Sequence, residues 1–337
     1  MKIGTLENIQ HAKSLLNTTL LRPKPSSLID DYGRCMKKLR VSLLEACNFR
    51  CFYCMPEEVQ FLKNKNLLSV EEVYKITKTM VGFGVDEVRL TGGEPLLRKD
   101  FKEIVLKLST LPLKKLGLTT NAFYLEKELE FLKFTRLNHL NISLDSLDAN
   151  KFNRITKRNG FHQVMSAILK AQKMNFRVKL NMVLLRGVND SEVFDFINFS
   201  KENNIEVRFL EVMKIGQAYT QNNNIYMSAQ EIIELIKQKE PLIPVPMAKD
   251  STSFNFRTSS GASIGFIASE SQSFCGACSR LRLSSEGFLR ACLMKEDGLS
   301  LRNKSEEEIY ELCNKVLKLK PIERLYGIKQ DMYKIGG

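Results

Sequence analysis

Short runs of alternating apolar and polar residues, separated by segments with helical periodicity, fill the sequence as far as Gly216. Six runs have the length and composition of strands. They are Leu39–Leu44, Glu87–Thr91, Leu116–Thr120, Leu140–Asp145, Val178–Leu184 and Glu206–Glu211. The intervening segments predict helices over Ser69–Val81, Phe101–Leu108, Leu125–Phe134, Phe161–Lys173 and Ser191–Glu202. Because parallel strands need such crossovers, the pattern predicts a six-strand parallel α/β barrel or open sheet.

The predicted strands differ from ordinary buried parallel strands, which are apolar on both faces. In the first strand, Arg40 and Ser42 alternate with apolar residues. The same alternation in the other strands involves Glu87, Arg89, Thr91, Gly117, Thr119, Asn141, Ser143, Asp145, Lys179 and Asn181. If helices cover the apolar face, the polar face lines a shared interior, which must hold a polar ligand because unpaired buried charge is costly. The alternative is an antiparallel sheet with one face in water.

Beyond Gly216 the regular alternation of strands and helices stops. A short helix is predicted near Ala229–Gln238, and hairpin-like runs follow around Ile264–Ala268 and Leu281–Leu293. A capping box formed by Ser305 and Glu308 opens a closing helix. We therefore predict an N-terminal extension over residues 1–36, a barrel over 37–220 and a second, mostly β domain over 221–337.

The 337 residues include 51 Lys and Arg against 38 Asp and Glu, a formal net charge of +13. This excess indicates a polyanionic partner, without separating a nucleic acid from a nucleotide. Apolar runs stay shorter than a membrane span, and the amino-terminal residues lack the apolar core of a secretory signal. We therefore expect a cytoplasmic protein with no membrane partner.

Six of the eight cysteines form two groups of three. The first group, C-x3-C-x2-C, consists of Cys47, Cys51 and Cys54 and follows the first predicted strand. Three thiolates can surround one metal centre while leaving a coordination position open for catalysis. Thiolates suit zinc or iron–sulfur clusters, but a structural zinc site needs four ligands, and the histidines lie far away in the sequence.

The second group, C-x2-C-x13-C, consists of Cys275, Cys278 and Cys292. Alone it is compatible with half of a structural zinc ribbon, with Cys313 as the fourth ligand. However, Arg280 and Arg282 closely follow Cys278, and two guanidinium groups beside an open metal suit a phosphate-bearing ligand.

A further motif, Gly92-Gly93-Glu94-Pro95, follows the second predicted strand. The two glycines permit a close backbone approach. Pro95 favours an extended conformation at Glu94, which could aim its carboxylate at a ligand ammonium group.

With its aromatic residues and Met-Pro ending, the segment CNFRCFYCMP resembles the cluster loop of radical S-adenosylmethionine (SAM) enzymes. Together the two cysteine triplets, the R-x-R motif and the terminal Gly336-Gly337 resemble the GTP 3′,8-cyclase family within that superfamily. The resemblance covers about residues 37–337. It implies a partial (βα)6 TIM-like barrel and a C-terminal, mostly β domain that carries a second 4Fe–4S cluster.

The resemblance also implies a reaction and partners. Enzymes of this family cleave SAM reductively to a 5′-deoxyadenosyl radical, which converts GTP to (8S)-3′,8-cyclo-7,8-dihydroguanosine 5′-triphosphate. This is the first step of molybdenum cofactor biosynthesis. The implied partners are a low-potential electron donor and, downstream, cyclic pyranopterin monophosphate synthase. A nucleic-acid partner is not expected, and a homodimer is left open.

Carried over by motif, the family's site residues fall on several positions of this sequence. The first 4Fe–4S cluster is assigned to Cys47, Cys51 and Cys54, and the second to Cys275, Cys278 and Cys292. SAM contacts are assigned to Tyr53, Gly93, Glu94, Ser143 and Met213. GTP contacts are assigned to Arg40, Arg89, Thr119, Lys179, Arg280 and Arg282. The residues assigned to catalysis are Arg40, Gly336 and Gly337.

Two departures from the family pattern lie near the expected site. Leu44-Glu45-Ala46 stands in place of Thr-Asp-Arg before the first cysteine, and Ala122 replaces the glycine of Thr-Thr-Asn-Gly. One rival function is another radical SAM enzyme with an auxiliary cluster, such as a peptide-modifying one, which would generally carry more cysteines there. The other is a zinc-dependent nucleic-acid-binding module, which would present its basic residues in an exposed run.

Overall fold

The computed structural model describes residues 27–62, 64–219 and 225–335. Its strands are β1 (Lys38–Ser42), β2 (Glu87–Thr91), β3 (Lys115–Thr120), β4 (Leu137–Ser143), β5 (Arg177–Leu184), β6 (Glu206–Glu211), β7 (Leu242–Val245), β8 (Phe254–Thr258), β9 (Ser263–Ile267), β10 (Arg280–Leu283), β11 (Phe288–Arg290) and β12 (Leu299–Ser300). The α-helices are α2 (Val70–Gly82), α3 (Phe101–Ser109), α4 (Leu129–Lys133), α5 (Ala149–Thr156), α6 (Phe161–Lys173), α7 (Val193–Asn203), α9 (Ala229–Lys237), α10 (Glu306–Lys318) and α11 (Met332–Ile335).

Within the described residues, the strands form one sheet in the order β12-β11-β10-β1-β2-β3-β4-β5-β6-β9-β8-β7. Every neighbouring pair from β10 to β9 is parallel. The outer pairs at both edges are antiparallel. The predicted parallel core is therefore confirmed, and the C-terminal strands extend both of its edges.

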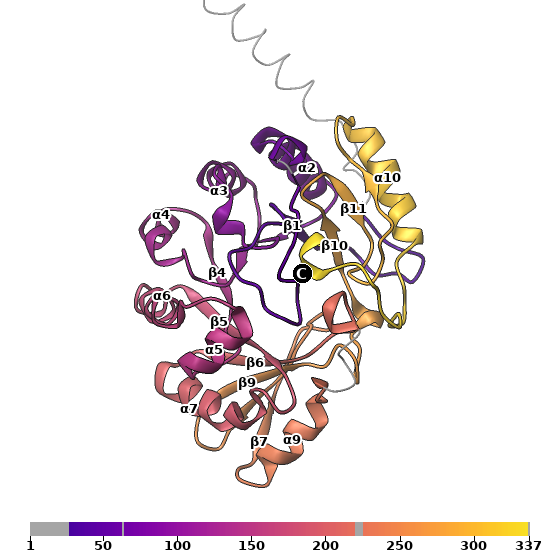
Figure 1. Ribbon diagram of the computed structural model, residues 1–337. Helices are drawn as coiled ribbons and strands as arrows, with labels where there is room; N and C mark the ends of the chain where they lie inside the picture. Colours follow the sequence, from indigo (N-terminus) through magenta and orange to yellow (C-terminus); the bar gives the residue numbers. More distant parts are fainter. Residues whose placement is uncertain (1–26, 63, 220–224, 336–337) are drawn as a thin grey trace, which may run out of the picture.

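Helices cover the outside of this curved sheet. Figure 1 shows α2, α3, α4, α6 and α7 around an open ring of strands, with α11 over its middle. On β1, Leu39 and Val41 are buried, and on β2 so are Val88 and Leu90. Arg40 pairs in register with Arg89 on the other face. The apolar face thus packs against helices and the polar face lines the interior, so the antiparallel alternative is wrong.

Most predicted elements coincide closely with the structure. The bounds of β2, α6 and β6 match the predicted ranges. The predicted helix over Leu125–Phe134 consists of a 3-10 turn, Glu126–Glu128, followed by α4. Strand β4 begins at Leu137 rather than at the predicted Leu140. The prediction missed its start because the polar residues Asn138 and His139 interrupt the apolar alternation.

Helix α5 was not predicted. It is short and mostly polar, and its buried side chains are those of Phe152, Ile155 and Thr156. Asp148 caps it by accepting a hydrogen bond from the backbone N–H of Lys151 at 2.7 Å. A cap and two apolar residues are too weak a pattern for sequence periodicity to detect.

The predicted capping boxes are present. Ser69 and Glu72 cap α2, and Ser305 and Glu308 cap α10. The described part of the N-terminal extension is not peripheral, since Leu28 and Met36 are fully buried in the main core. None of the described helices is both long and apolar enough to cross a membrane.

Candidate active site

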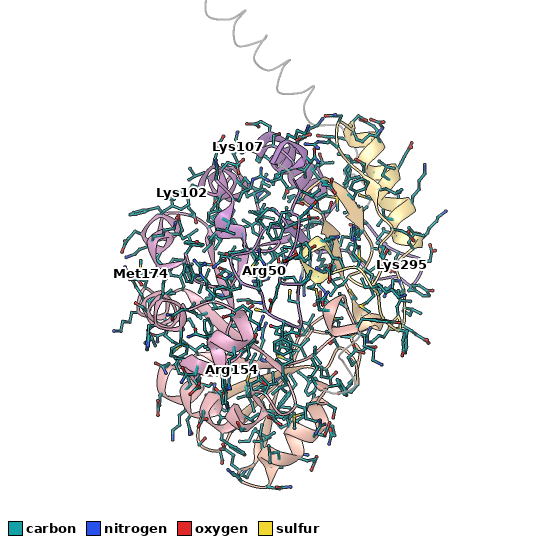
Figure 2. The ribbon with its side chains drawn as sticks, in the orientation of Figure 1. Arg50, Lys102, Lys107, Arg154, Met174 and Lys295 are labelled. Atoms are coloured by element: carbon teal, nitrogen blue, oxygen red, sulfur yellow. The ribbon has the colours of Figure 1, made fainter. Side chains whose placement is uncertain are left out.

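The first cysteine triplet lies on the loop that follows β1, at the carboxyl end of the parallel strands. Arg50, which Figure 2 places toward the middle of the ring, fixes this loop. Its Nη1 donates to the carbonyl oxygens of Cys47 at 2.7 Å and Phe49 at 2.8 Å. The Sγ of Cys47 accepts hydrogen bonds from the backbone N–H of Phe49 at 3.4 Å and from Asn121 Nδ2 at 3.7 Å. Such bonds favour the thiolate form that a metal centre needs.

The Gly92-Gly93 turn packs directly against the segment before Cys47. The backbone N–H of Gly93 donates to the carbonyl oxygen of Leu44 at 2.8 Å. A Cβ atom on Gly93 would collide with the carbonyl oxygens of Glu45 and Ala46. The close approach predicted for these glycines is therefore present, and its partner is the chain's own backbone.

Glu94 is extended, as predicted, with φ −118° and ψ 106°. Its Oε1 accepts from the Leu96 N–H at 3.0 Å and from Thr120 Oγ1 at 2.8 Å, and its Oε2 accepts from the Asn121 N–H at 2.7 Å. Burial raises the pKa of Glu94 to about 7. The carboxylate is thus held firmly by its own chain at the wall of the cavity described below.

A second carboxylate, that of Asp145, also approaches the first triplet. Its Oδ2 accepts from the Tyr53 hydroxyl at 2.6 Å and its Oδ1 from the Val183 N–H at 2.9 Å. Burial raises the pKa of Asp145 to about 6. Burial and, after it, the carboxylate of Asp145 raise the pKa of Cys51 well above its ordinary value. The surroundings of the first triplet are therefore anionic.

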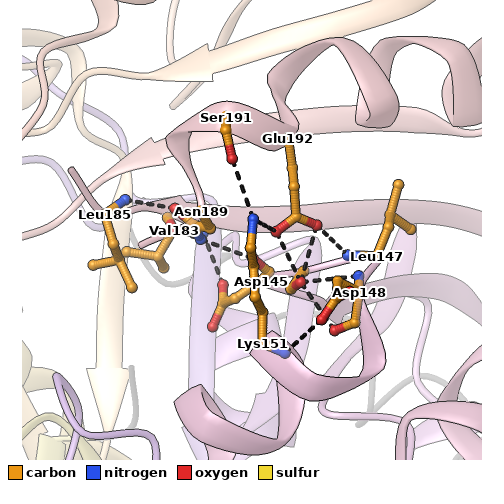
Figure 3. A network of polar contacts seen from close by, with 10 residues as sticks. Asp145, Leu147, Asp148, Lys151, Val183, Leu185, Asn189, Ser191 and Glu192 are labelled. Carbon is orange, nitrogen blue, oxygen red and sulfur yellow. Dashed lines mark hydrogen bonds and ion pairs between the residues drawn. The ribbon is translucent and has the colours of Figure 1, made fainter. Parts of the chain in front are cut away.

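The backbone around Asp145 is fixed by the network in Figure 3. Asn189 Nδ2 donates to the carbonyl oxygens of Asp145 at 2.7 Å and Val183 at 2.9 Å. Glu192, which is buried, accepts from the Leu147 N–H at 2.7 Å and forms an ion pair with Lys151 at 3.1 Å. The loop between β4 and α5 is consequently rigid, which holds the Asp145 carboxylate in place.

The second triplet lies at the amino end of β10, the strand that pairs in parallel with β1. Cys275 and Cys278 flank a 3-10 turn before β10, and Cys292 follows β11. Burial alone would raise the pKa of Cys278, but Arg280 and Lys320 outweigh burial and lower it to about 7. Cys278 therefore lies in cationic surroundings, whereas burial raises the pKa of Cys275.

All six cysteines line one cavity of about 360 Å³. Of the other predicted site residues, the cavity is also lined by Arg40, Tyr53, Gly93, Glu94, Thr119, Ser143, Met213, Arg280 and Arg282. Met332 and Tyr333, near the C-terminal end of the described chain, lie on its wall too. The two sets of sulfurs therefore line one cavity, although among the described residues no three His, Cys, Asp or Glu side chains lie close enough together to hold a single metal ion.

A second, strongly basic cavity of about 270 Å³ adjoins the first, and Arg40, Asn141, Arg208 and Arg280 line both. Arg89 and Lys179, the remaining predicted GTP contacts, lie in this second cavity. Burial, then Arg282, Arg280 and Arg89, lower the pKa of Arg40 well below its ordinary value. Repulsion among these guanidinium groups indicates that the space suits an anion.

Several predicted site features have a different local arrangement. Lys179 forms an ion pair with Glu206 at 2.7 Å, so this lysine is already partnered. Cys313, considered as a fourth ligand of the second triplet, packs instead between α10 and α2 with its Sγ 3.4 Å from Met80 Sδ. Gly336 and Gly337 lie outside the described residues.

Sequence reasoning missed several residues at the site. Arg34 donates to the carbonyl oxygen of Cys275 at 2.7 Å, although the extension that contains it showed no chemistry in the sequence. Lys320 contacts the second triplet, and Arg208 lines both cavities. The polar position of Arg208 on a strand was a detectable signal. Arg34 and Lys320 carry no local signal, because their partners are remote in the sequence.

Comparison with family models matches residues 41–200 to the radical SAM superfamily and residues 205–325 to Molybdenum Cofactor Synthesis C. Among curated relatives, a GTP 3′,8-cyclase of Synechocystis is 46% identical over 318 residues, which is 94% of this chain and 97% of the relative. A GTP 3′,8-cyclase of Listeria monocytogenes is 39% identical over 311 residues, covering 90% of this chain and 93% of the relative.

Solved structures share the fold at much lower identity. Streptococcus suis SuiB bound to S-adenosylmethionine matches with a TM-score of 0.62 and 13% identity, over 94% of this chain and 75% of that one. The protein anSMEcpe with bound AdoMet matches with a TM-score of 0.51 and 14% identity, over 84% and 83% of the two chains.

Proposed function

Since this chain belongs to the GTP 3′,8-cyclase family of radical SAM enzymes, whose activity in molybdenum cofactor biosynthesis it shares, we propose that its cysteine-lined cavity is where SAM and GTP meet. The observation that carries this proposal is that both cysteine triplets open into one cavity whose two sides differ in charge. A cationic cofactor and an anionic nucleotide fit those two sides.

The first side fits a 4Fe–4S cluster with SAM. Cys47, Cys51 and Cys54 would hold the cluster, which would supply the one electron that divides SAM into methionine and a 5′-deoxyadenosyl radical. Tyr53, Gly93, Glu94, Ser143 and Met213, all on the cavity wall, would hold SAM. The carboxylates of Glu94 and Asp145 suit its ammonium and sulfonium charges. The buried Oδ1 of Asn181 has no hydrogen-bond partner among the described residues and faces the same cavity, so it suits a ligand donor.

The second side fits a second 4Fe–4S cluster. Cys275, Cys278 and Cys292 would hold it, and the cationic surroundings of Cys278 stabilise thiolate charge. Three cysteine ligands leave one iron open to the nucleotide. The arrangement thus supports a binding role for this cluster and a radical-generating role for the first.

GTP would lie between the clusters and extend toward the basic cavity. Arg40, Arg89, Thr119, Lys179, Arg280 and Arg282 would contact it. The buried Nη2 of Arg280 has no partner within the described chain, which suits a phosphate oxygen. Arg40, at the junction of the two cavities, would orient the nucleotide for reaction. Gly336 and Gly337 are proposed to complete the catalytic residues.

The wider setting follows from this chemistry. The first cluster requires a low-potential electron donor, and the cyclised nucleotide would pass to cyclic pyranopterin monophosphate synthase. We propose a cytoplasmic location and division at residues 36/37 and 220/221. The basic residues line an interior cavity, which supports a nucleotide rather than a nucleic acid as the polyanionic partner. A homodimer remains a proposal.

The test is anaerobic reconstitution followed by metal and product analysis. We expect about eight irons per chain, from two four-iron clusters. Incubation with GTP, SAM and a strong reductant should yield 5′-deoxyadenosine and cyclised GTP in equal amounts. A preparation with about four irons and the same product would contradict the second cluster, whereas 5′-deoxyadenosine without cyclised GTP would contradict the assigned use of the cavity.

A further inference from the structure

A buried lysine connects two backbone segments of the second cysteine triplet, the one that carries Cys278 and the one that carries Cys292. Lys320, just after α10, is 3% exposed. Its Nζ donates to the carbonyl oxygens of Arg280 at 2.6 Å and Ala291 at 2.9 Å, and to Cys278 Sγ at 3.5 Å. An ammonium group has three N–H donors, so this set satisfies all of them.

The position of these acceptors in the sequence is informative. Arg280 lies two residues after Cys278, and Ala291 lies immediately before Cys292. One ammonium group therefore fixes the start of β10 relative to the end of β11. Since Cys278 and Cys292 lie at those two ends, Lys320 sets the separation of their backbones.

Arg34 secures the same region through backbone carbonyl groups. Its Nη1 donates to the carbonyl oxygens of Cys275 at 2.7 Å and Pro321 at 2.9 Å, and its Nη2 to that of Lys320 at 3.3 Å. Asp30 neutralises Arg34 through an ion pair at 2.6 Å. The third cysteine of the triplet is thus tied to the segment that carries Lys320.

The charge of Lys320 is balanced differently. Burying an ammonium group is costly unless a counter-charge lies nearby. Whereas Arg34 pairs with a carboxylate, the acceptors that Lys320 contacts are two carbonyl oxygens and the Cys278 sulfur. Three thiolates around a 4Fe–4S core carry net negative charge, so the proposed cluster would supply the counter-charge for the Lys320 ammonium group.

We propose that Lys320 is a positioning residue for the second cluster. It holds together the backbone segments that carry Cys278 and Cys292, and its charge stabilises the reduced state of the cluster. This inference rests on the second cluster proposed above. A cation beside a cluster favours the added electron, because charge and hydrogen bonds at the sulfurs set its potential. Removal of that cation should make the cluster harder to reduce.

The test uses the full chain with Cys47, Cys51 and Cys54 changed to Ser, so that the second cluster is measured alone. Midpoint potentials by spectroscopic redox titration are compared between this background, Lys320→Met and Lys320→Gln. Both neutral variants should lose at least tenfold in the equilibrium constant for one-electron reduction, about 59 mV toward more negative potential. Lys320→Gln, which keeps N–H donors, should retain more iron than Lys320→Met.

The matched control is Arg98→Met. Arg98 is likewise buried and donates to two carbonyl oxygens, those of Leu43 and Leu68, but it does not contact the second triplet. This variant should lower stability without moving the potential. If Lys320→Met cannot hold the cluster, selective loss of iron with a melting temperature like that of the control supports the positioning role.

Failure of the proposed second cluster and failure of the proposed role of Lys320 would give different results. A background protein without any cluster would overturn the proposed second cluster and this inference with it. A background protein with a normal cluster whose potential and iron content do not change in Lys320→Met would overturn the inference alone.

Discussion

The two cysteine triplets supply the same three ligands but lie in opposite electrostatic surroundings. Around the first, burial, its neighbour Cys47 and the Asp145 carboxylate raise the pKa of Cys54 to about 12. Around the second, Arg280 and Lys320 overcome burial and lower the pKa of Cys278 to about 7. Ligand spacing alone therefore does not define the chemistry of a cluster, since the surrounding charge selects what can bind beside it.

The loops that carry the triplets are also held differently. The first is fixed by backbone contact with the glycine turn and by local bonds from Arg50. The second is fixed by Arg34 and Lys320, which come from segments remote in the sequence. The first loop should therefore be sensitive to added volume and the second to loss of charge.

Exchange of each triplet for serine should remove one activity and leave the other. Cys47→Ser with Cys51→Ser and Cys54→Ser should abolish formation of 5′-deoxyadenosine, because no centre remains to cleave SAM. The corresponding triple variant of Cys275, Cys278 and Cys292 should abolish cyclised GTP while SAM cleavage continues. Each should lower iron from about eight to about four atoms per chain, measured together with both products. Equal loss of 5′-deoxyadenosine in both variants would show that the roles are not divided.

Adding one methyl group at a glycine should destabilise the protein at the first cysteine loop but not at the second. In Gly93→Ala the new Cβ meets the backbone oxygens of Glu45 and Ala46, so the free energy of unfolding should fall by about 1–3 kcal/mol, with loss of iron from the first cluster. Gly276, inside the second triplet, is the matched control because a Cβ there meets no atom within 4 Å. Denaturant unfolding and iron content measure both effects. A Gly276→Ala variant as unstable as Gly93→Ala would contradict the assigned difference.

Loss of the two arginine charges beside the second triplet should weaken the binding of GTP but not that of SAM. Arg280→Gln with Arg282→Gln should weaken GTP binding by about tenfold or more for each arginine, since a charged hydrogen bond contributes about 1.5–3 kcal/mol. SAM binding should change little. Arg302→Gln is the control, because Arg302 is ion-paired with Glu72 at 2.7 Å on the outer side of the barrel. Equilibrium binding of each ligand gives the comparison, and a similar loss for GTP and SAM would contradict it.

The sequence predicted the cysteine groups and the polar strand positions because both are local patterns. The spacing from Cys47 to Cys54 and the alternation around Arg40 are visible within a few residues. The parallel pairing of β10 with β1 and of β9 with β6 joins distant segments, and no local periodicity encodes it. Lys320 was missed for the same reason, since its partners lie about 30–40 residues away.

Loss of the Asp145 carboxylate charge should weaken SAM binding only slightly. Asp145→Asn keeps the side-chain shape and an oxygen that can accept from the Val183 N–H, while its NH2 group can donate to the Tyr53 hydroxyl oxygen; the negative charge is lost. The SAM dissociation constant should rise about threefold to tenfold, corresponding to about 0.7–1.4 kcal/mol. The midpoint potential of the first cluster should become less negative, because an anion beside it is lost.

Asp148→Asn separates this charge effect from a general effect on the loop. Asp148 lies three residues away and caps α5. Asn is an equally good cap, so this variant should leave SAM affinity and potential unchanged. If both variants weaken SAM binding equally, the β4–α5 loop would act by its rigidity alone. If only Asp145→Asn does so, the carboxylate itself makes the first triplet's side of the cavity suitable for a cation.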